Sequence, residues 1–396
     1  MKERDFLVIG GGPAGTSFAA EAAKDATVAV LEEHGSIGLP VQCTGLVAPR
    51  VVEMARAEST VLNRLRGAYF HFPGGQLVEV RSPEAKAVVV DRAAFDQVCA
   101  DRALDAGAEL LLGERFLDAR FGKGVVARCR DAEGVREHGA KLLVGADGYK
   151  SNVARCAGLG GSKDLVRGVQ LDLRHRLDEQ DMLDVHIGRE VAPEFFAWSI
   201  PCGDMTRVGL CTSGRHGTPL SHLRPFLARQ GLEEERRLRV ISGLIPIGPP
   251  AQTYADRALI IGDAAGQAKP LSGGGLCTGM VAASCAASTA LSCLREDDFS
   301  AASLSSYQVK WKAEIGRELD RGFLIRRAYV RLSDRKLEEV GRILSKEEVR
   351  DVLSQGDIDF PSALAPQVLR AAPSLLKLAP SFLATLFPWP GARNQK

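Results

Sequence analysis

The sequence predicts a mixed α/β (α+β) fold, in which parallel buried strands are combined with an antiparallel sheet and a helical C-terminal region. Buried-strand runs open the chain and return near residues 142–147 and 258–263, as expected for a sheet assembled from βαβ units. Polar and apolar residues alternate through residues 165–215, which is typical of an antiparallel sheet with one covered face. From about residue 300 the pattern becomes helical.

The first elements form a βαβ unit. Residues 5–10 indicate a buried strand, residues 14–25 an Ala-rich helix and residues 27–32 a second strand. The turn between the first strand and the helix contains the segment Gly10-Gly11-Gly12-Pro13-Ala14-Gly15. This order predicts a Rossmann-like dinucleotide-binding domain at the start of the chain.

The glycines of this turn fit the pattern G-x-G-x-x-G. Gly10 permits a tight turn, Gly12 lets the backbone approach a pyrophosphate, and Gly15 permits close packing of the helix. The helix N-terminus offers free N–H groups and a positive dipole end to the phosphates. Glu32 ends the second strand, where an acid is expected to accept hydrogen bonds from the adenosine ribose.

The elements that follow are marked by local signals. Residues 68–80 alternate around Pro73-Gly74-Gly75 and predict a hairpin. Residues 91–106 predict a helix with Asp91 as its N-cap. Two short strands near 108–118 and 124–130 follow, and a helix is expected near 220–230.

Two later segments favour FAD over a nicotinamide cofactor. Gly145-Ala146-Asp147-Gly148 and Gly262-Asp263-Ala264-Ala265-Gly266 each follow a strand, and Pro270-Leu271-Ser272-Gly273-Gly274-Gly275 opens a helix of small residues. Asp263 is placed to bond the ribityl chain. The helix N-terminus would direct N–H groups to the pyrimidine edge of the flavin and stabilise its anionic reduced form. Cofactor contacts are therefore expected at Gly10, Gly12, Pro13, Ala14, Gly15, Glu32, Asp147, Gly148, Asp263, Pro270, Gly273, Gly274 and Gly275.

Composition excludes several other classes of protein. The net charge of the 396-residue chain is +2, and no basic run with interleaved aromatic residues suggests nucleic-acid binding. The N-terminus has no pattern of a signal peptide. The nine cysteines include no CxxC pair, so no metal site is expected and a reducing cytoplasm is the simplest location. The seven histidines are not clustered in the sequence, and none is assigned a role.

Together, the fingerprint, the Gly-Ala-Asp-Gly segment and the Gly-Asp-Ala-Ala-Gly segment resemble the hydroxylase-type FAD-dependent oxidoreductases. Three further segments are similar to the geranylgeranyl reductase branch, including its archaeal digeranylgeranylglycerophospholipid reductases: Ile37 to Leu46, Phe196 to Pro201 with Val208-Gly209-Leu210, and Pro270 to Leu276. The resemblance covers about residues 4–330. It implies flavin contacts at Ala14, Glu32, Cys43, Gly45, Arg92, Asp263, Gly275 and Leu276, and near Phe116.

This chain departs from the family pattern at two positions. The family often has Cys-Gly-Glu-Gly-Leu, whereas this chain has Cys43-Thr44-Gly45-Leu46, which is one residue shorter and lacks the acid. Phe196 stands where the aromatic segment often begins with Tyr. These differences concern the substrate more than the cofactor.

The resemblance implies reduction of isolated C=C bonds in geranylgeranyl chains, most simply of archaeal-type membrane lipid precursors. Hydride from the flavin would reach one alkene carbon while an acid protonates the other, and Trp198 would offer an apolar wall and a π face to the developing cation. Cys43 and Trp198 are thus the candidate catalytic residues. For Cys43, proton donation and simple positioning of the flavin both remain open.

The alternative activity is that of a flavin monooxygenase or halogenase of the same superfamily, since these enzymes use the same flavin site. Ferredoxin, a deazaflavin and NADPH all remain open as the electron donor.

Two stretches are candidates for membrane contact. Pro270–Leu294 is uncharged but consists mostly of small residues, which favours a core helix. The C-terminal region carries four arginines and a series of apolar side chains, namely Arg321, Arg326, Arg327, Arg331, Leu375, Leu376, Leu378, Phe382, Leu383, Leu386, Phe387 and Trp389. A helical cap on the core and a peripheral membrane surface are both consistent with this pattern.

The expected domain organisation is discontinuous. Residues 1–65, 90–160 and 250–300 would form the FAD-binding domain, residues 66–89 and 161–249 the substrate-binding antiparallel-sheet domain, and residues 301–396 the C-terminal helical region. The flavin ring is expected between the first two domains.

Overall fold

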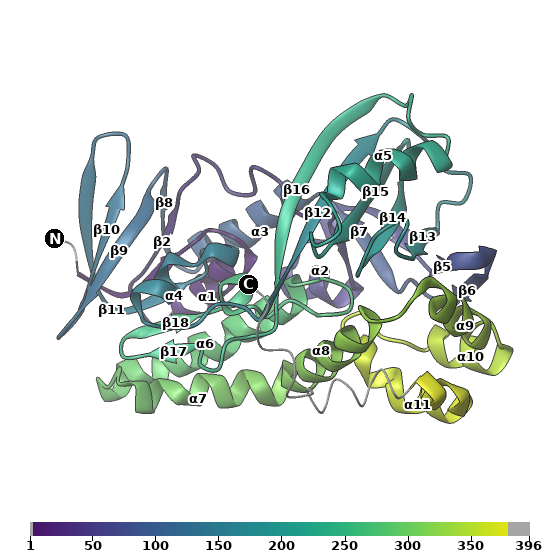
Figure 1. Ribbon diagram of the computed structural model, residues 1–396. Coiled ribbons are helices and arrows are strands. Elements are labelled where there is room, and N and C mark those ends of the chain that lie inside the picture. Colours follow the sequence, from purple (N-terminus) through teal and green to yellow (C-terminus); the bar gives the residue numbers. More distant parts are fainter. Residues whose placement is uncertain (1–2, 379–396) are drawn as a thin grey trace, which may run out of the picture. The chain divides into compact units, whose positions relative to one another are not determined.

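The computed structural model describes residues 3–378, whose elements are labelled in Figure 1. They divide into two compact units, each assembled from three separate stretches of the chain. Unit 1 comprises Met1–Leu62, Val89–Leu165 and Leu244–Leu319, and unit 2 comprises Asn63–Val88, Val166–Gly243 and Asp320–Lys396. The region from residue 301 does not form a third unit, because it is divided between these two at Leu319.

Unit 1 contains an eight-stranded sheet. Its parallel part has the order β18-β11-β1-β2-β8, and β17, β10 and β9 add antiparallel strands. The strands are β1 (Glu3–Ile9), β2 (Val28–Glu32), β8 (Glu109–Leu112), β9 (Arg115–Phe121), β10 (Val125–Arg130), β11 (Val135–Gly145), β17 (Tyr254–Ala255) and β18 (Ala258–Ile260).

The buried strands predicted near the N-terminus and at residues 142–147 and 258–263 are confirmed. The single strand expected at 108–118 is wrong, because the chain turns at Gly113 with a φ of +75°. The segment therefore forms two strands with different partners, with β8 beside β2 and β9 beside β10.

In the described part of the chain, six α-helices lie wholly in unit 1. They are α1 (Pro13–Ala22), α2 (Pro49–Ala55), α3 (Arg92–Asp105), α4 (Asn152–Cys156), α6 (Leu276–Glu296) and α7 (Ala301–Trp311). The predicted start of α3 is confirmed, since the Asp91 carboxylate accepts hydrogen bonds from the N–H groups of Ala93 and Ala94 at 3.0 and 3.2 Å. Helix α1 packs against both α3 and α6.

Within residues 3–378, α6 is the helix that is long and apolar enough to cross a membrane. However, 61% of its apolar window is buried inside the protein, and its small residues permit close contact with α1. A Cβ at Gly279 would lie 3.6 Å from the Ala14 Cβ. The burial supports the core-helix interpretation.

Unit 2 contains a seven-stranded sheet of order β16-β12-β15-β14-β13-β5-β6. The strands are β5 (Gly67–His71), β6 (Leu77–Arg81), β12 (Asp164–Leu173), β13 (Met182–Ile187), β14 (Phe196–Cys202), β15 (Met205–Thr212) and β16 (Arg237–Ile247). The β5–β6 hairpin is confirmed. The antiparallel expectation holds for most of the sheet, but β13 pairs with β5 in parallel. The alternation of polar and apolar residues shows which side chains share a face. It does not specify the direction of a strand such as β5, which comes from a distant stretch of the chain.

The two faces of this sheet differ. Helix α5 (Pro219–Arg229) covers one face with Leu223, Phe226 and Leu227, which pack against an apolar cluster on the strands. Because side chains alternate along a strand, Gln170, Asp172 and Trp198 lie on the opposite face.

Among residues 3–378, the remaining β-strands and α-helices are three short strands and the helices that follow α7. Strands β3 (Leu46–Val47), β4 (Val61–Leu65) and β7 (Ala87–Val90) precede α3, and a π-helical turn (Lys312–Gly316) joins α7 to α8 (Arg317–Tyr329). In unit 2, α9 (Asp334–Leu344), α10 (Glu347–Ser354) and α11 (Ala365–Ala371) follow. They enclose a small apolar cluster that includes Ile343 and Val349.

The predicted lipid-facing residues of the C-terminal region are mostly untested by the structure. Phe382, Leu383, Leu386, Phe387 and Trp389 lie outside the described residues, as do the side chains of Leu376 and Leu378. Leu375 packs against the cluster of Ile343 and Val349. For Arg326 the lipid-facing interpretation is wrong: the residue is 2% exposed, donates to the Glu194 carbonyl at 3.0 Å and lies over the Phe195 ring.

Candidate functional site

The glycine turn of unit 1 has the geometry that a phosphate-binding turn requires. Gly10 has a φ of +106°, and a Cβ there would lie 2.3 Å from the Ala146 carbonyl oxygen. A Cβ at Gly15 would lie 2.1 Å from the Gly10 carbonyl oxygen. Both positions therefore require glycine for the fold itself. A Cβ at Gly12 would meet no protein atom within 4 Å, so this position is open for a ligand.

Glu32 lies at the end of β2 beside this turn. Its Oε2 accepts a hydrogen bond from the Gly11 N–H at 2.8 Å, and its Oε1 accepts one from the His34 N–H at 3.0 Å. The His34 ring Nδ1 lies 2.5 Å from the same Oε1. The carboxylate thus stabilises the turn, and its contact with a ribose stays a prediction.

The second glycine-rich segment holds Asp263 against the start of α6. A Cβ at Gly275 would lie 3.1 Å from Asp263 Oδ1. Desolvation by the surrounding protein raises the pKa of Asp263 to about 6, while the charge of Arg92 opposes this shift. The side chain nevertheless remains accessible from a cavity, which is the arrangement expected of a group that a ligand covers.

A buried chain of hydrogen bonds fixes the turn that carries Asp263. Gln267 Oε1 accepts from the Gly262 N–H at 2.7 Å, and Gln267 Nε2 donates to the Tyr307 hydroxyl at 3.1 Å. The Tyr307 hydroxyl in turn donates to the Ile260 carbonyl at 2.9 Å. All these groups are buried, so the position of Asp263 is set by α7 as well as by its own strand.

The residues of unit 1 fit FAD. Helices α1 and α6 begin at Gly12 and Gly275 without any side-chain cap, so their first N–H groups are available to a ligand. The 590 Å³ cavity that reaches Asp263 is lined mainly by residues 149–162, and its volume is in the range of small-molecule sites.

Cys43, Arg92 and Asp96 form a second group in unit 1. Arg92 donates from Nη2 to both carboxylate oxygens of Asp96, at 2.8 and 3.0 Å. It also interacts with the Cys43 sulfur, which accepts a hydrogen bond from the Gly45 N–H at 3.4 Å. Burial alone would lower the pKa of Arg92, but Cys43 and Asp96 together raise it. Burial raises the pKa of Asp96, and Arg92 opposes that shift.

The remaining expected cofactor contacts have varied surroundings. Asp147 caps α4, since its Oδ2 accepts from the N–H groups of Asn152 and Val153 at 2.7 and 3.1 Å. Phe116 is 5% exposed within the apolar core of unit 1. The cofactor roles of both residues stay predictions.

The loop before α6 is closed by its own backbone. Lys269 N–H donates to the Gly274 carbonyl at 2.9 Å, and Gly273 N–H donates to the Lys269 carbonyl at 2.8 Å. Gly273 and Gly148 have φ values of +73° and +74°. The predicted contact residues of this loop, Pro270, Gly273, Gly274, Gly275 and Leu276, therefore form one tight turn into α6.

Trp198, the candidate catalytic residue of unit 2, is held by a buried polar network. Its Nε1 donates to Gln170 Oε1 at 3.2 Å, and Gln170 Nε2 donates to Asp172 Oδ1 at 2.9 Å. Asp172 Oδ2 is paired with Arg239 at 2.6 Å. The indole lies over Gly209, where a Cβ would come within 2.6 Å of the ring. The ring is therefore fixed in one orientation.

Sequence reasoning missed Asp96, Gln170, Asp172 and Gln267. Asp96 could have been found, because it follows Arg92 by four residues on a predicted helix, where opposite charges meet. The partners of the other three are set by strand register or by contact with a distant helix, for which the sequence carries no local signal.

Comparison with known proteins assigns the chain to a family. Residues 5–338 match the family model described as Lycopene cyclase protein. Digeranylgeranylglycerophospholipid reductase 2 of Methanothermobacter thermautotrophicus is 30% identical over 91% of this chain and 97% of its own length. The protein of that name from Methanopyrus kandleri is also 30% identical, over 94% and 98%.

The chain belongs to the geranylgeranyl reductase family of FAD-dependent oxidoreductases.

Solved structures agree on the fold of this family. A geranylgeranyl bacteriochlorophyll reductase-like protein of Thermoplasma acidophilum superposes with a TM-score of 0.86 at 24% identity, covering 96% of this chain and 100% of that one. The flavin-dependent halogenase CmlS superposes with a TM-score of 0.68 at 18% identity, covering 95% and 78%. At these identities the similarity shows the fold alone.

Proposed function

We propose that this protein is an FAD-dependent reductase that hydrogenates isolated C=C bonds in geranylgeranyl chains of archaeal-type membrane lipid precursors. The observation that carries the proposal is similarity over nearly the full length to proteins named digeranylgeranylglycerophospholipid reductase. The uncapped N-termini of α1 and α6 and the accessible Asp263 support the cofactor part.

An isolated alkene imposes a specific chemical demand. Reduced FAD, when bound, supplies hydride, but no carbonyl is conjugated to the double bond to accept the negative charge. The protein must therefore provide a proton to the other alkene carbon and stabilise positive charge that develops in the transition state.

Cys43 is the proposed proton donor. Its sulfur is held by the Gly45 N–H and lies beside the Arg92 guanidinium. A cation next to the sulfur stabilises the thiolate that remains after proton transfer. Asp96 holds the guanidinium in place through two hydrogen bonds. In unit 2, the proposed role of Trp198 is to present its fixed ring to the prenyl chain.

The test is anaerobic turnover. Protein reduced with dithionite is incubated with geranylgeranyl lipids, and the products are analysed by mass spectrometry. We expect each reduced double bond to add two hydrogens. If several prenyl lipids are all recovered unchanged by protein that contains reduced flavin, the reductase proposal is wrong.

The Cys43 proposal has its own readout. In Cys43→Ser we expect FAD content and flavin reduction to stay normal while alkene hydrogenation falls at least about a hundredfold, the usual contribution of a positioned acid. Cys156→Ser is the matched control, since Cys156 is also a half-buried thiol of unit 1. Normal hydrogenation by Cys43→Ser would leave Cys43 a positioning role only.

The alternative activities give different products. Similarity of fold to a monooxygenase and a halogenase supports a flavin monooxygenase or halogenase activity as the second candidate. Products that form only when oxygen is admitted would favour it. The match to the Lycopene cyclase model adds a redox-neutral cyclisation, which would yield an isomer of the substrate without added hydrogen.

The electron donor is proposed to be ferredoxin, a deazaflavin or NADPH. Stopped-flow reduction of the bound flavin by each donor separates them. We also propose that the protein is cytoplasmic and contacts the membrane peripherally, because a membrane is where a lipid substrate would reside.

A further inference from the structure

Three potential metal ligands meet on the α5-covered face of unit 2. His71 on β5 and His186 on β13 are register partners across the parallel strand pair, and Asp184 precedes His186 by two residues. One ligand atom from each of the three lies within 4.8 Å of the other two. His71 Nε2 is 2.6 Å from Asp184 Oδ1. The histidines are unclustered in the sequence, and strand register brings them together.

Two buried polar atoms in this region lack a hydrogen-bond partner. One is His186 Nε2, on a residue that is 9% exposed, and the other is Ser199 Oγ, on a residue that is 3% exposed. Ser199 lies directly opposite Asp184 on the neighbouring strand β14. A buried polar atom that is left without a partner destabilises the folded state. Both residues lie beside Asp184, whose carboxylate, like the His71 imidazole, can bind a metal ion.

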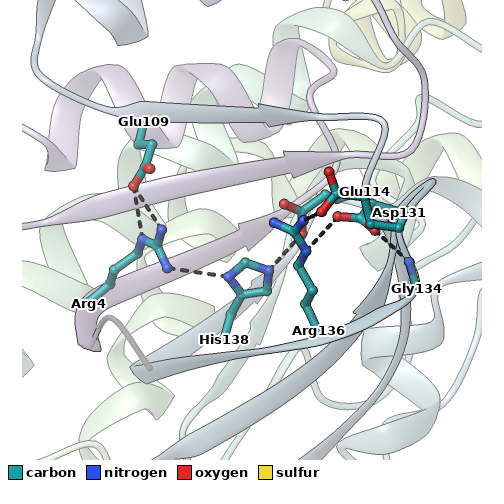
Figure 2. Close-up of polar contacts among 8 residues, drawn as sticks. Arg4, Glu109, Glu114, Asp131, Gly134, Arg136 and His138 are labelled. Atoms are coloured by element: carbon teal, nitrogen blue, oxygen red, sulfur yellow. Dashed lines mark hydrogen bonds and ion pairs between the residues drawn. The ribbon is translucent and has the colours of Figure 1, made fainter.

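A second cluster among the described residues does not share this property. Glu114, Cys129 and His138 of unit 1 also lie within 4.8 Å of one another. As Figure 2 shows, however, His138 is bonded on both sides, to Glu114 at 2.6 Å and to Arg4 at 3.4 Å. The Arg4 guanidinium, which is also paired with Glu109, would repel a bound cation. This group is a closed polar network.

We propose that His71, Asp184 and His186 bind one divalent transition-metal ion of the Zn²⁺ class. Two imidazole nitrogens and one carboxylate oxygen are the donor set that Zn²⁺ and its neighbours accept in proteins. The ion would tie β5 to β13, and thereby join two distant stretches of the chain at one point of the sheet. The proposal does not depend on FAD or on the proposed reaction.

Binding requires one rearrangement. The His71 and His186 rings are stacked, with centroids 4.2 Å apart and planes 6° from parallel, whereas a metal–nitrogen bond lies in the plane of the ring. His186 is held edge-on by Phe226. The side chain of His71 is 37% exposed, so the His71 ring is the one that turns, exchanging its hydrogen bond with Asp184 for a shared ion.

The experiment uses full-length protein without a histidine tag, treated with a chelator and then dialysed against Co²⁺ or Zn²⁺. We expect one ion per chain, a Co²⁺ visible spectrum without thiolate charge-transfer bands, and a higher Tm with Zn²⁺. His71→Ala and Asp184→Asn should each lower the affinity at least about tenfold. Both positions are partly exposed, so these variants should fold as the wild type does, which the Tm without metal verifies.

His222→Ala and His138→Gln are the matched controls and should bind Co²⁺ as the wild type does. The absence of retained metal in the wild type would overturn the proposal and leave buried water as the partner of His186 and Ser199. Binding that survives in His71→Ala and Asp184→Asn, or a thiolate-type Co²⁺ spectrum, would also overturn it.

Discussion

At the scale of single residues, the glycines of the first turn have two separate tasks. Gly10 and Gly15 are needed because a side chain would collide with the backbone of unit 1. A Cβ at Gly12 would meet no protein atom within 4 Å, so the fold itself leaves room for a side chain there, and a bound pyrophosphate is the predicted reason for glycine. The structure thus shows that the fold requires Gly10 and Gly15, whereas a cofactor contact at Gly12 stays a prediction.

Gly12→Ala should fold normally and bind FAD poorly. The Tm of the apoprotein should match the wild type, while FAD affinity should fall at least tenfold, or about 1.4 kcal/mol. Gly10→Ala should instead destabilise the apoprotein by more than about 1–2 kcal/mol, because its φ of +106° disfavours a side chain. Gly122→Ala, in an exposed turn, is the control. Unchanged FAD affinity in Gly12→Ala would contradict this division.

FAD affinity should also depend on pH through Asp263. In the apoprotein the pKa of Asp263 is raised from 3.8 to about 6, so between these two pH values the folded state holds a proton that the unfolded chain gives up. Hydrogen bonds from ribityl hydroxyls favour the ionised carboxylate. FAD affinity should therefore rise, and apoprotein stability should fall, as the pH rises toward about 6, and both should level off above it.

Titrations of flavin fluorescence on either side of that pH measure the effect. Asp263→Asn should bind FAD more weakly and lose this pH dependence, and its apoprotein stability should vary less over the same range. Parallel pH curves for Asp263→Asn and the wild type would show that another group is responsible.

At the scale of elements, two other strands of the same sheet orient the Trp198 ring, the candidate substrate-facing group. Trp198 on β14 is bonded to Gln170 on β12, whose amide is held by Asp172. Gly209 on the intervening strand β15 leaves room for the indole. Each of these contacts depends on strand order and register, since β12 and β14 are separated by β15 in the sheet.

Gln170→Ala should raise the KM for the prenyl lipid several-fold and shift tryptophan emission. The reason is that the indole N–H loses its acceptor, which costs about 1–3 kcal/mol for a buried group. FAD content and the rate of flavin reduction should not change. Gln76→Ala removes an exposed amide of the same unit and is the control. If KM and emission are both unchanged in Gln170→Ala, the network has no part in substrate binding.

At the scale of the whole molecule, neither unit is continuous in the chain. The chain passes between the two units several times, so each unit depends on stretches that are far apart in sequence. The residues expected to hold FAD lie in unit 1, whereas Trp198 lies in unit 2. The proposed reaction therefore requires the intact chain.

The full-length protein should float with anionic lipid vesicles, and a variant that lacks residues 379–396 should float less. Apolar side chains of that segment would enter the interface of the lipid bilayer, while basic side chains of the C-terminal region would meet the anionic lipid headgroups. A truncation from residue 371 is less informative, because Ala372 and Leu375 belong to a packed cluster of unit 2. Flotation of the full-length protein with uncharged vesicles tests whether attraction to anionic headgroups contributes to binding, in which case it should be weaker than with anionic vesicles. Equal flotation of both proteins would support the helical-cap interpretation instead.

The sequence alone determined the features whose causes are local. The glycine turn, the Asp91 cap and the β5–β6 hairpin depend on residues a few positions apart, so their patterns predicted them. Only the tertiary structure decided which distant side chains meet. Gln170 and Trp198 are 28 positions apart, and His71 and Asp184 are 113 apart. Strand order and register join them, and the burial of whole sheet faces sets that register.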